Sequence, residues 1–374
     1  MRVSKLNRVG VDEGRLHGSR FSVATATRAS TVTALLAIPV ILLLFSLPAF
    51  ASRALLQELF YVFTMLALAQ LWNLLAGCTG LISVGQQAFV GIGAYALFAC
   101  TLMAGLEPVL SIVLAGIVAG VVAVPAALIV FRLRGAYFAI GTWVVAEVCR
   151  LVLAQFKQLG GGTGTSLPPN TVDSIVGLDF VRQLFQVRGP AARDILAYWL
   201  ALVLAVGTLA LVYKLLRSRY GLALSAIGDA EVAAESTGVD VFRTKLLIYI
   251  VTAIVTGMAG ALIFLQKARI SPDAAFSLID WTAYVIFIVV IGGIGTMEGP
   301  IIGVVIFYLL QYYLAALGAW YLILLGALAI LLMLFAPTGV WGLMSHVFDV
   351  SLFPVRRRLI VRPKVAAGEP GGKP

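Results

Sequence analysis

The sequence is poor in charge, in histidine and in cysteine. Charged residues make up 12% of the 374, and the chain holds only 2 histidines and 3 cysteines. A soluble domain of this length carries about twice that charged fraction. His17 and His346 are far apart, and Cys78, Cys100 and Cys149 lie in apolar surroundings without a Cys-x-x-Cys spacing. The cysteines are therefore interpreted as small core residues, and no metal site is expected.

Signatures of catalysis are also missing. Two remote histidines cannot build a conventional triad, and no His-Glu-x-x-His motif occurs. No glycine cluster ends in the Gly-Lys-Ser/Thr of a phosphate loop. The apolar stretches also lack the paired carboxylates of many proton-driven carriers. The sequence thus argues against a membrane hydrolase and against a chain with its own ATPase site.

What the chain has in abundance is apolar sequence. Hydrophobic residues make up 61%, and the mean hydropathy is +1.02. Stretches of about 17–25 apolar residues are long enough to span a bilayer as helices. We therefore predict an all-α integral membrane protein with about ten transmembrane helices. The predicted spans are Thr31–Phe50, Leu55–Ala76, Leu81–Ala104, Val109–Phe131, Gly135–Phe156, Ile195–Leu216, Leu246–Leu265, Leu278–Ile294, Ile301–Leu317 and Trp320–Pro337.

The net charge of +10 follows membrane topology rather than nucleic-acid binding. Most Lys and Arg residues fall at the termini and in alternate connecting segments, which the positive-inside rule assigns to the cytoplasm. Both termini are then cytoplasmic. The predicted domains are a basic N-terminal segment (1–30), a transmembrane domain (31–337) with an external loop (157–193) and a cytoplasmic loop (217–245), and a C-terminal tail (338–374) whose last dozen residues are disordered.

A signal peptide is the alternative interpretation of the first span. The sequence Ala49-Phe50-Ala51 resembles a cleavage site. However, the basic segment before the span and the apolar run itself are both longer than in ordinary signal peptides. We expect the span to be retained.

The cytoplasmic loop Arg217–Lys245 is the most informative stretch of the chain. Asp229 can cap a short helix of about two turns over Ala230–Thr237, and Gly238 can end it. Small side chains lie on one face of this helix. A short capped helix at a membrane surface is suited to binding by another protein.

Polar side chains interrupt the third predicted span. Ser83, Gln86 and Gln87 lie near its inner end, where they need partners in the protein or in a wet cavity. We favour a role in lining or gating a path for the glutamines. The glycines nearby fit either close helix packing or a break in the helix.

The fifth predicted span contains a charged pair. Glu147 and Arg150 are three residues apart, so they share a helix face and can pair. They are either a polar element of a translocation route or a structural ion pair in which Arg150 reaches toward the outer surface.

A glycine-rich motif begins at the end of the eighth predicted span. Gly292, Gly293, Gly295 and Gly299 permit a tight turn, and Pro300 can begin the next helix. Because no strand–turn–helix unit surrounds these glycines, a hinge or turn at the membrane surface is preferred over nucleotide binding.

Taken in order, these motifs resemble the permease family of branched-chain amino acid ATP-binding cassette (ABC) importers, specifically the LivM-type subunit. The similarity runs from about the first span to the last. The matching stretches are Ser83-x-Gly85-Gln86-x-x-Phe89-x-Gly91-x-Gly93-Ala94-Tyr95, Arg132-Leu-Arg134-Gly135-x-Tyr137-Phe138-Ala139 with Glu147-x-x-Arg150, Glu231-Val-Ala-Ala-x-x-x-Gly238, and Gly292-Gly293-x-Gly295-x-x-x-Gly299-Pro300-x-x-Gly303.

The resemblance implies an ABC importer permease fold in a bacterial inner membrane. It implies a second homologous permease subunit, two cytoplasmic ATPase subunits that carry ATP and Mg²⁺, and an external solute-binding protein. This chain would bind no cofactor itself. Its Glu231–Gly238 helix would be the coupling helix that docks on an ATPase.

The sequence departs from the family pattern at the coupling helix. The glutamate of the usual Glu-Ala-Ala stands one step early, at Glu231, which shifts the expected docking contact to Ala233, Ala234 and Gly238. Asp229 completes the predicted coupling set.

Other functions fit the sequence less well. A self-contained, ion-coupled secondary transporter would need coupling-ion ligands at mid-membrane. An ABC permease for urea or short amides is a further alternative. A structural membrane scaffold predicts no transport defect on deletion.

Overall fold

The structure, a computed structural model, describes residues 20–24, 28–314, 317–336, 338–348, 353 and 358–362. The chain divides into a large unit of residues 37–350 and a small unit formed by residues 1–36 and 351–374. Residues 1–19 of the predicted basic segment and the predicted disordered end of the tail lie outside the described residues.

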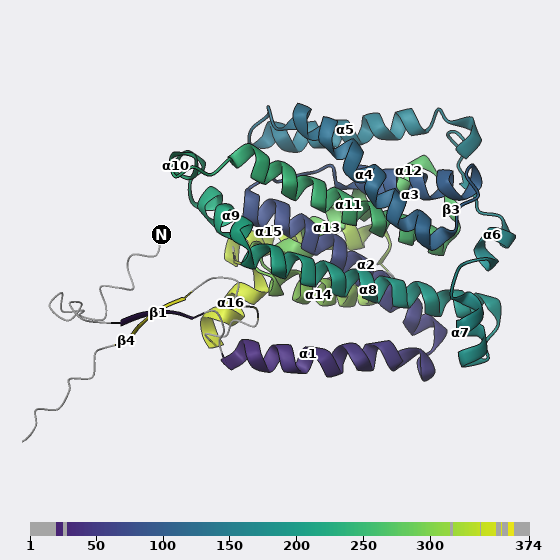
Figure 1. Cartoon of the computed structure of the whole chain (residues 1–374), viewed down its shortest axis with the longest axis horizontal. Coiled ribbons are helices and arrows are strands. Elements are labelled where there is room, and N and C mark those ends of the chain that lie inside the picture. Colours follow the sequence, from purple (N-terminus) through teal and green to yellow (C-terminus); the bar gives the residue numbers. More distant parts are fainter. Residues whose placement is uncertain are drawn as a thin grey trace, which may run out of the picture. The chain divides into compact units, whose positions relative to one another are not determined.

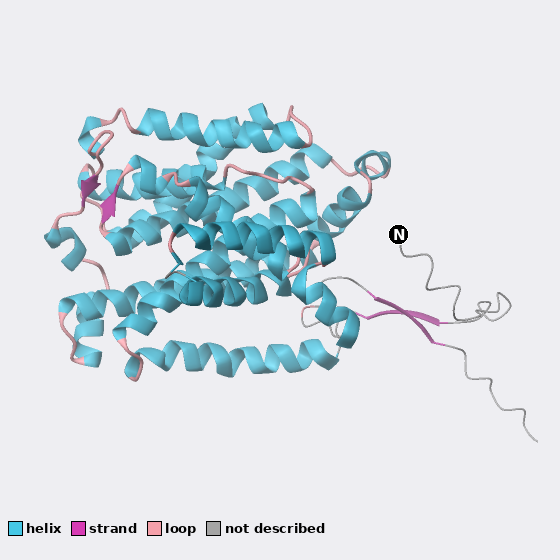
Figure 2. Ribbon diagram, turned by 180° about the vertical axis from the view of Figure 1, so that it is seen from behind, coloured by secondary structure: helices cyan, strands magenta, loops and turns pink. Residues whose placement is uncertain are grey.

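Long apolar helices dominate the large unit and confirm the all-α membrane class (Figure 2). Helices occupy all the ranges predicted as spans, but only seven described stretches are long and apolar enough to cross a membrane. The seven are Arg53–Cys78, Pro108–Val130, Ala136–Leu153, Gly189–Arg217, Val241–Lys267, Pro272–Gly292 and Trp320–Ser345. Three shorter apolar helices are Leu35–Ala49, Gln86–Leu102 and Glu298–Leu314. Ten crossings remain a prediction.

The main helices are α1 (Arg28–Ser46), α2 (Arg53–Asn73), α3 (Gln86–Leu102), α4 (Pro108–Val130), α5 (Ala136–Leu153), α8 (Gly189–Arg217), α11 (Val241–Lys267), α13 (Tyr284–Gly292), α14 (Glu298–Leu314), α15 (Ala319–Phe335) and α16 (Gly339–Phe348). Two π-helical turns interrupt them, η4 (Leu74–Cys78) after α2 and η6 (Ile279–Ala283) before α13. The short 3-10 turn η3 (Leu47–Ala49) follows α1.

Glycines allow the central helices to approach closely. Helix α11 packs along α3 and α4. A Cβ atom on Gly93 of α3 would overlap the carbonyl of Gly257 on α11, and one on Gly260 would overlap the backbone of Val90. Small residues at such contacts let backbones meet and maximise packing where lipid supplies no hydrophobic driving force.

Short elements mark two opposite ends of the large unit, as both views show (Figures 1 and 2). One end carries α9 (Arg219–Asp229) and α10 (Glu231–Ser236). The other carries α6 (Pro169–Asp173), α7 (Leu178–Phe185), α12 (Pro272–Ala275) and the antiparallel strands β2 (Thr165–Ser166) and β3 (Arg269–Ile270), with the 3-10 turn η5 (Lys157–Leu159). The predicted loops 157–193 and 217–245 therefore lie at opposite ends and are largely structured.

The helices beside these loops extend beyond the predicted spans. Helix α8 begins at Gly189 and α11 at Val241, several residues before the predicted spans. Asp240 caps α11 through a bond from the Arg243 amide, which lets this helix begin in sequence too polar for a span. Within the loop, Ser218 caps α9 through a bond from the Tyr220 amide.

The small unit contains a strand pair that the sequence analysis did not predict. β1 (Arg20–Ala24) pairs antiparallel with β4 (Arg358–Arg362), with Arg20 opposite Arg362 and Ala24 opposite Arg358. Segments near the two ends of the chain are thus neighbours.

Candidate functional site

The predicted coupling helix exists as α10 but is shorter than expected and lacks its predicted cap. Asp229 is the last residue of α9, not the cap of α10. Ala230 precedes α10 in an extended conformation, with no side-chain bond to the helix. Helix α9 was not predicted from the sequence, and it places Asp229 at its own C-terminal end.

Gly238 ends α10 through its left-handed backbone, with φ of +86°. The Gly238 amide donates to the Glu235 carbonyl at 3.0 Å, and the Val239 amide donates to the Ala234 carbonyl at 3.1 Å. This pair of bonds is a Schellman motif, and its positive φ favours glycine.

The faces of α10 differ from the predicted docking face. Ala234 is only 2% exposed and packs with Ile227 of α9 and Val241 of α11. Ala233 and Gly238 are exposed. Val232, which the sequence analysis did not select, is 81% exposed. The predicted contact through Ala234 is therefore corrected: this side chain anchors α10, and the free apolar surface lies at Val232 and Ala233.

Glu231 fixes α10 to the start of α11. Its Oε1 forms an ion pair with Nζ of Lys245, whose side chain is 12% exposed, while Glu231 itself is 55% exposed. Because the glutamate stands at position 231, it pairs with Lys245 of the same chain, and this ion pair joins α10 to α11 at the surface.

The predicted path residues are buried at and just before the start of α3. Helix α3 begins at Gln86, not at Leu81. The Gln86 Nε2 donates to the Leu68 carbonyl at 3.0 Å, ten residues before η4 ends at Cys78. Leu68 lies within α2, so the first turn of α3 contacts the body of α2 rather than its end. The location of these residues near the inner end of a span stays a prediction.

Thr282 of η6 holds the first turn of α3. Its hydroxyl accepts from the Gln87 amide at 3.2 Å and donates to Gln87 Oε1. Gln86 and Gln87 are both buried, and Gln86 Oε1 has no partner among the described atoms. Thr282 was missed because a single threonine in an apolar run carries no signal of its own.

Irregular backbone leads into α3. The Ser83 carbonyl accepts from Trp72 Nε1 at 2.7 Å, and the Ser83 hydroxyl accepts from the Gly85 amide at 3.2 Å. The Val84 amide donates to Thr142 Oγ1 of α5 at 3.0 Å. Non-helical backbone at membrane depth requires such internal partners or a water-filled cavity.

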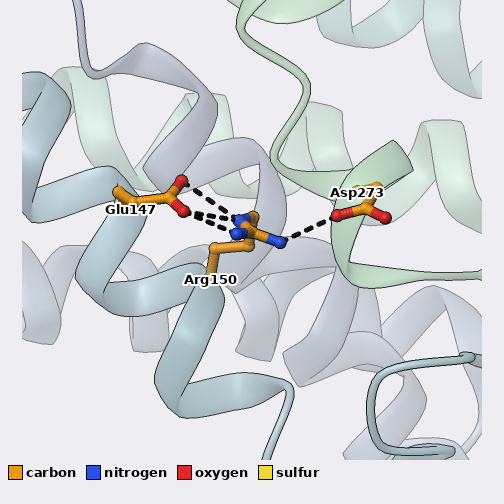
Figure 3. Close-up of polar contacts among 3 residues, drawn as sticks. All are labelled: Glu147, Arg150 and Asp273. Carbon is orange, nitrogen blue, oxygen red and sulfur yellow. Dashed lines mark hydrogen bonds and ion pairs between the residues drawn. The ribbon is translucent and has the colours of Figure 1, made fainter.

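Glu147 and Arg150 form the predicted pair on α5, and Asp273 of α12 joins them (Figure 3). Arg150 Nε lies 3.0 Å from both Glu147 carboxylate oxygens, and Arg150 NH1 lies 2.8 Å from Asp273 Oδ1. The side chains of Glu147 and Arg150 remain 45% and 26% exposed. This charge cluster therefore faces out of the isolated chain.

The glycine motif forms a tight turn between two packed helices. Helix α13 ends at Gly292, and α14 begins at Glu298 rather than at Pro300, which lies in its first turn. Gly293 and Gly295 have φ of +126° and +79°. A Cβ atom on Gly292 would overlap the Gly299 carbonyl.

Helix α2 holds this turn through two side chains that the sequence analysis missed. Gln70 Nε2 donates to the Met297 carbonyl at 2.6 Å. Asn73 Nδ2 donates to the Thr296 carbonyl at 2.8 Å, while Asn73 Oδ1 accepts from the Gly295 amide at 2.8 Å. The turn is clamped, which argues against a freely moving hinge.

The predicted residues thus form three separate groups: the α10 surface, the polar start of α3 with the neighbouring α5, and the α13–α14 turn. Contact between α3 and α5 joins Ser83–Gly85 to Thr142, five residues before Glu147. Among the described residues, no group of three or more His, Cys, Asp or Glu side chains is placed to hold a metal ion.

Comparison with known proteins gives a consistent result. Residues 55–334 match the family model described as the permease component of branched-chain amino acid transport systems. The chain is 31% identical over 280 residues to the high-affinity branched-chain amino acid transport system permease protein LivM of Salmonella typhimurium, covering 71% of this chain and 65% of that protein. It is 30% identical to the Escherichia coli LivM with the same coverage.

A more distant relative is the probable LivH permease of Methanocaldococcus jannaschii, 28% identical over 153 residues, or 38% of this chain and 46% of that protein. The chain spans slightly less than two thirds of the length of the bacterial relatives. No solved structure matches it.

Proposed function

The chain belongs to the family of permease components of branched-chain amino acid transport systems, and from this we propose that it is the membrane-spanning subunit of an ABC importer for branched-chain or related amino acids. It is a multi-pass inner-membrane protein. The observation that carries the proposal is the family match over residues 55–334, which includes the polar start of α3, α10 and the glycine turn.

Ten membrane crossings with both termini in the cytoplasm fit this role. The helices in the predicted ranges include seven long and three shorter ones. Pairing of β1 with β4 brings together segments near the two ends of the chain, which supports an even number of crossings between them. The excess of Lys and Arg in the same segments favours the cytoplasmic side.

Helix α10 is the proposed contact for the ATPase. It lies at one end of the large unit, and it presents Val232 and Ala233 outward while Ala234 and the Glu231–Lys245 pair fix it to α9 and α11. An exposed apolar side chain on a rigid short helix suits insertion into a groove of a partner protein. Gly238 and Asp229 flank this contact.

The proposed gate consists of Ser83, Gln86 and Gln87. The proposed polar wall of the path consists of Glu147 and Arg150. The break before α3 resembles the discontinuous helices that build transporter sites near mid-membrane. The exposed charges on α5 require water or another chain beside them, because ionised groups facing lipid are costly.

The partners proposed are a second permease subunit, two ATPase subunits and an external solute-binding protein. The similarity to a LivH permease supports the second permease. ATP and Mg²⁺ would be bound by the ATPases. Their closure would move α10 and switch the path between inward- and outward-open states, provided that ATP binds the two states with different affinity.

Reconstitution tests the function. The chain is co-purified with its partners, placed in proteoliposomes, and assayed for uptake of radiolabelled leucine with and without ATP. Uptake that depends on ATP and is inhibited by isoleucine and valine is expected. Uptake by this chain alone, driven by an ion gradient, would instead establish a secondary transporter. Inhibition by urea or acetamide would show that the substrates are urea or short amides.

A matched pair of variants tests the coupling surface. Val232→Gln is expected to lower ATP-driven uptake about fivefold or more, because an apolar anchor at an interface typically contributes more than 1 kcal/mol. Val176→Gln changes an equally apolar residue, 67% exposed at the opposite end of the bundle, and leaves uptake unchanged. Equal uptake by both variants, with the complex assembled, would contradict docking through α10.

A further inference from the structure

The end of the large unit opposite α10 contains a cavity of about 270 Å³. Its walls come from the start of α2, the start of α8 and the end of α11, with Val172 of α6 and Ile175 beside them. None of these residues belongs to the motifs assigned above. The volume lies just below the usual range for ligand pockets and fits a metabolite rather than a nucleotide or an intact lipid.

Charge in the cavity is unbalanced. The lining contains three cationic side chains, Arg53, Arg193 and Lys267, and one carboxylate, Asp194. Asp194 is buried, and its carboxylate forms an ion pair with Arg53 Nε and accepts from Gln57 Nε2 at 3.1 Å. This carboxylate is therefore already satisfied by the wall itself.

Arg193 and Lys267 supply the remaining positive charge, and Asp280 is near enough to Lys267 to interact with it electrostatically. In the described part of the chain, neither has a carboxylate within ion-pair distance. The Lys267 ammonium lies 5.1 Å from the ring centre of Phe264 and 5.0 Å from that of Trp281. These cation–π contacts hold the ammonium in place while leaving its hydrogen-bond donors for a ligand.

Apolar side chains form much of the rest of the wall, together with Gln57 and Gln266. Val172, Ile175, Leu196, Leu200, Leu262 and Leu265 line the cavity beside the two cations. A ligand that satisfies both parts carries one anionic oxygen group on a small apolar body. Carboxylate oxygens accept charge-assisted bonds from Arg and Lys, and branched aliphatic groups fill a leucine- and valine-lined wall without leaving polar atoms unpaired.

We propose that this cavity, named here the outer pocket, is a binding site for the carboxylate of a small apolar amino acid, held by Arg193 and Lys267. The inference rests on the proposed import of amino acids and adds a site within this one subunit, away from the charged face of α5. An anionic phospholipid offers a phosphate of similar charge, but its two acyl chains exceed the volume of the pocket.

Binding of radiolabelled leucine to the assembled complex tests the proposal. The complex is placed in nanodiscs of phosphatidylcholine without the solute-binding protein, so that the lipid, a zwitterion, carries no net charge. Arg193→Gln and Lys267→Gln are each expected to weaken leucine binding about tenfold, because a hydrogen bond to a charged group is lost. Lys267→Arg keeps the charge and is expected to restore most of the binding.

Arg188→Gln is the matched control, since this exposed arginine lies five residues before Arg193 and outside the pocket. Its leucine affinity is expected to equal that of the unchanged protein. The carboxylate requirement is tested by competition: 4-methylpentanoate, which lacks the amino group, should displace leucine, and 3-methylbutylamine, which lacks the carboxylate, should not.

Three results would contradict the assignment of the outer pocket as an amino acid site. The first is equal affinity in Arg193→Gln, Lys267→Gln and Arg188→Gln. The second is displacement by the amine but not by the acid. The third is displacement of leucine by phosphatidylglycerol, which would assign the pocket to a lipid. If ATP-driven leucine uptake persists alongside any of these, the proposed function stands and only the pocket fails.

Discussion

Helices α2 and α5 are both apolar enough to span a membrane, yet 78% of the most apolar window in α2 is buried within the chain and only 17% of that in α5. Both carry polar groups. Gln70 and Asn73 of α2 donate to backbone carbonyls of the α13–α14 turn, whereas Glu147 and Arg150 of α5 stay partly exposed. Polar groups in α2 therefore belong to the architecture of this chain, and those in α5 need water or a partner.

The largest expected loss of stability comes from a change in the buried region that α2 shares with α3 and α11. Gly93→Val places side-chain atoms on the backbone of Gly257 and should destabilise the protein by about 3 kcal/mol. Thermal unfolding in detergent measures this loss. Gly207→Val in α8 is the control, because a Cβ atom there meets no atom within 4 Å. Equal melting temperatures for the two variants would show that the close approach is not needed.

Asn73→Ala tests whether the polar groups of α2 are structural. It removes one donor and one acceptor from the turn, leaving the Gly295 amide and the Thr296 carbonyl without their partner. The expected loss is about 2 kcal/mol of unfolding free energy. Asn170→Ala changes an exposed asparagine of α6 and is expected to leave the melting temperature unchanged. A smaller effect at Asn73 than at Asn170 would remove the distinction between the helices.

Arg150→Met tests the opposite expectation for α5. Leucine uptake should fall about tenfold, because two carboxylates then face the proposed path without a cation, while the melting temperature changes little since both are solvated. Arg182→Met is matched to it: Arg182 also pairs with two carboxylates, Asp173 and Asp179, but in the segment before α8. Uptake should survive this change. A large loss of thermal stability in Arg150→Met would make the cluster structural instead.

Glu231→Gln is expected to have the smallest effect. The ion pair with Lys245 is half exposed on the glutamate side, so its loss should cost about 0.5 kcal/mol or less. Uptake should fall less than in Val232→Gln. Because salt screens the ion pair, raising the ionic strength should make the difference in uptake between Glu231→Gln and the unchanged protein smaller still. Uptake lost completely in Glu231→Gln would return the docking role to the glutamate.

The same contrast explains what the sequence could predict. Apolar runs located the helices because spanning a bilayer demands length and composition, and Gly238 was found because a left-handed residue after a helix favours glycine. Helix α9 was missed because its sequence is too polar for a span. Gln70 and Thr282 were missed because their partners are more than a hundred residues away, and only packing brings them together.

Turn η6 places two neighbouring residues in contact with different parts of the molecule. The ring of Trp281 lies under the Lys267 ammonium, and the hydroxyl of Thr282 is bonded to Gln87 at the start of α3. A π-helical turn contains one residue more than an α-helical turn, so its conversion to α-helix would change the register of the residues within it. Trp281 and Thr282 are neighbours in this turn, so such a change would displace the contact with Lys267 and the bond to Gln87 together.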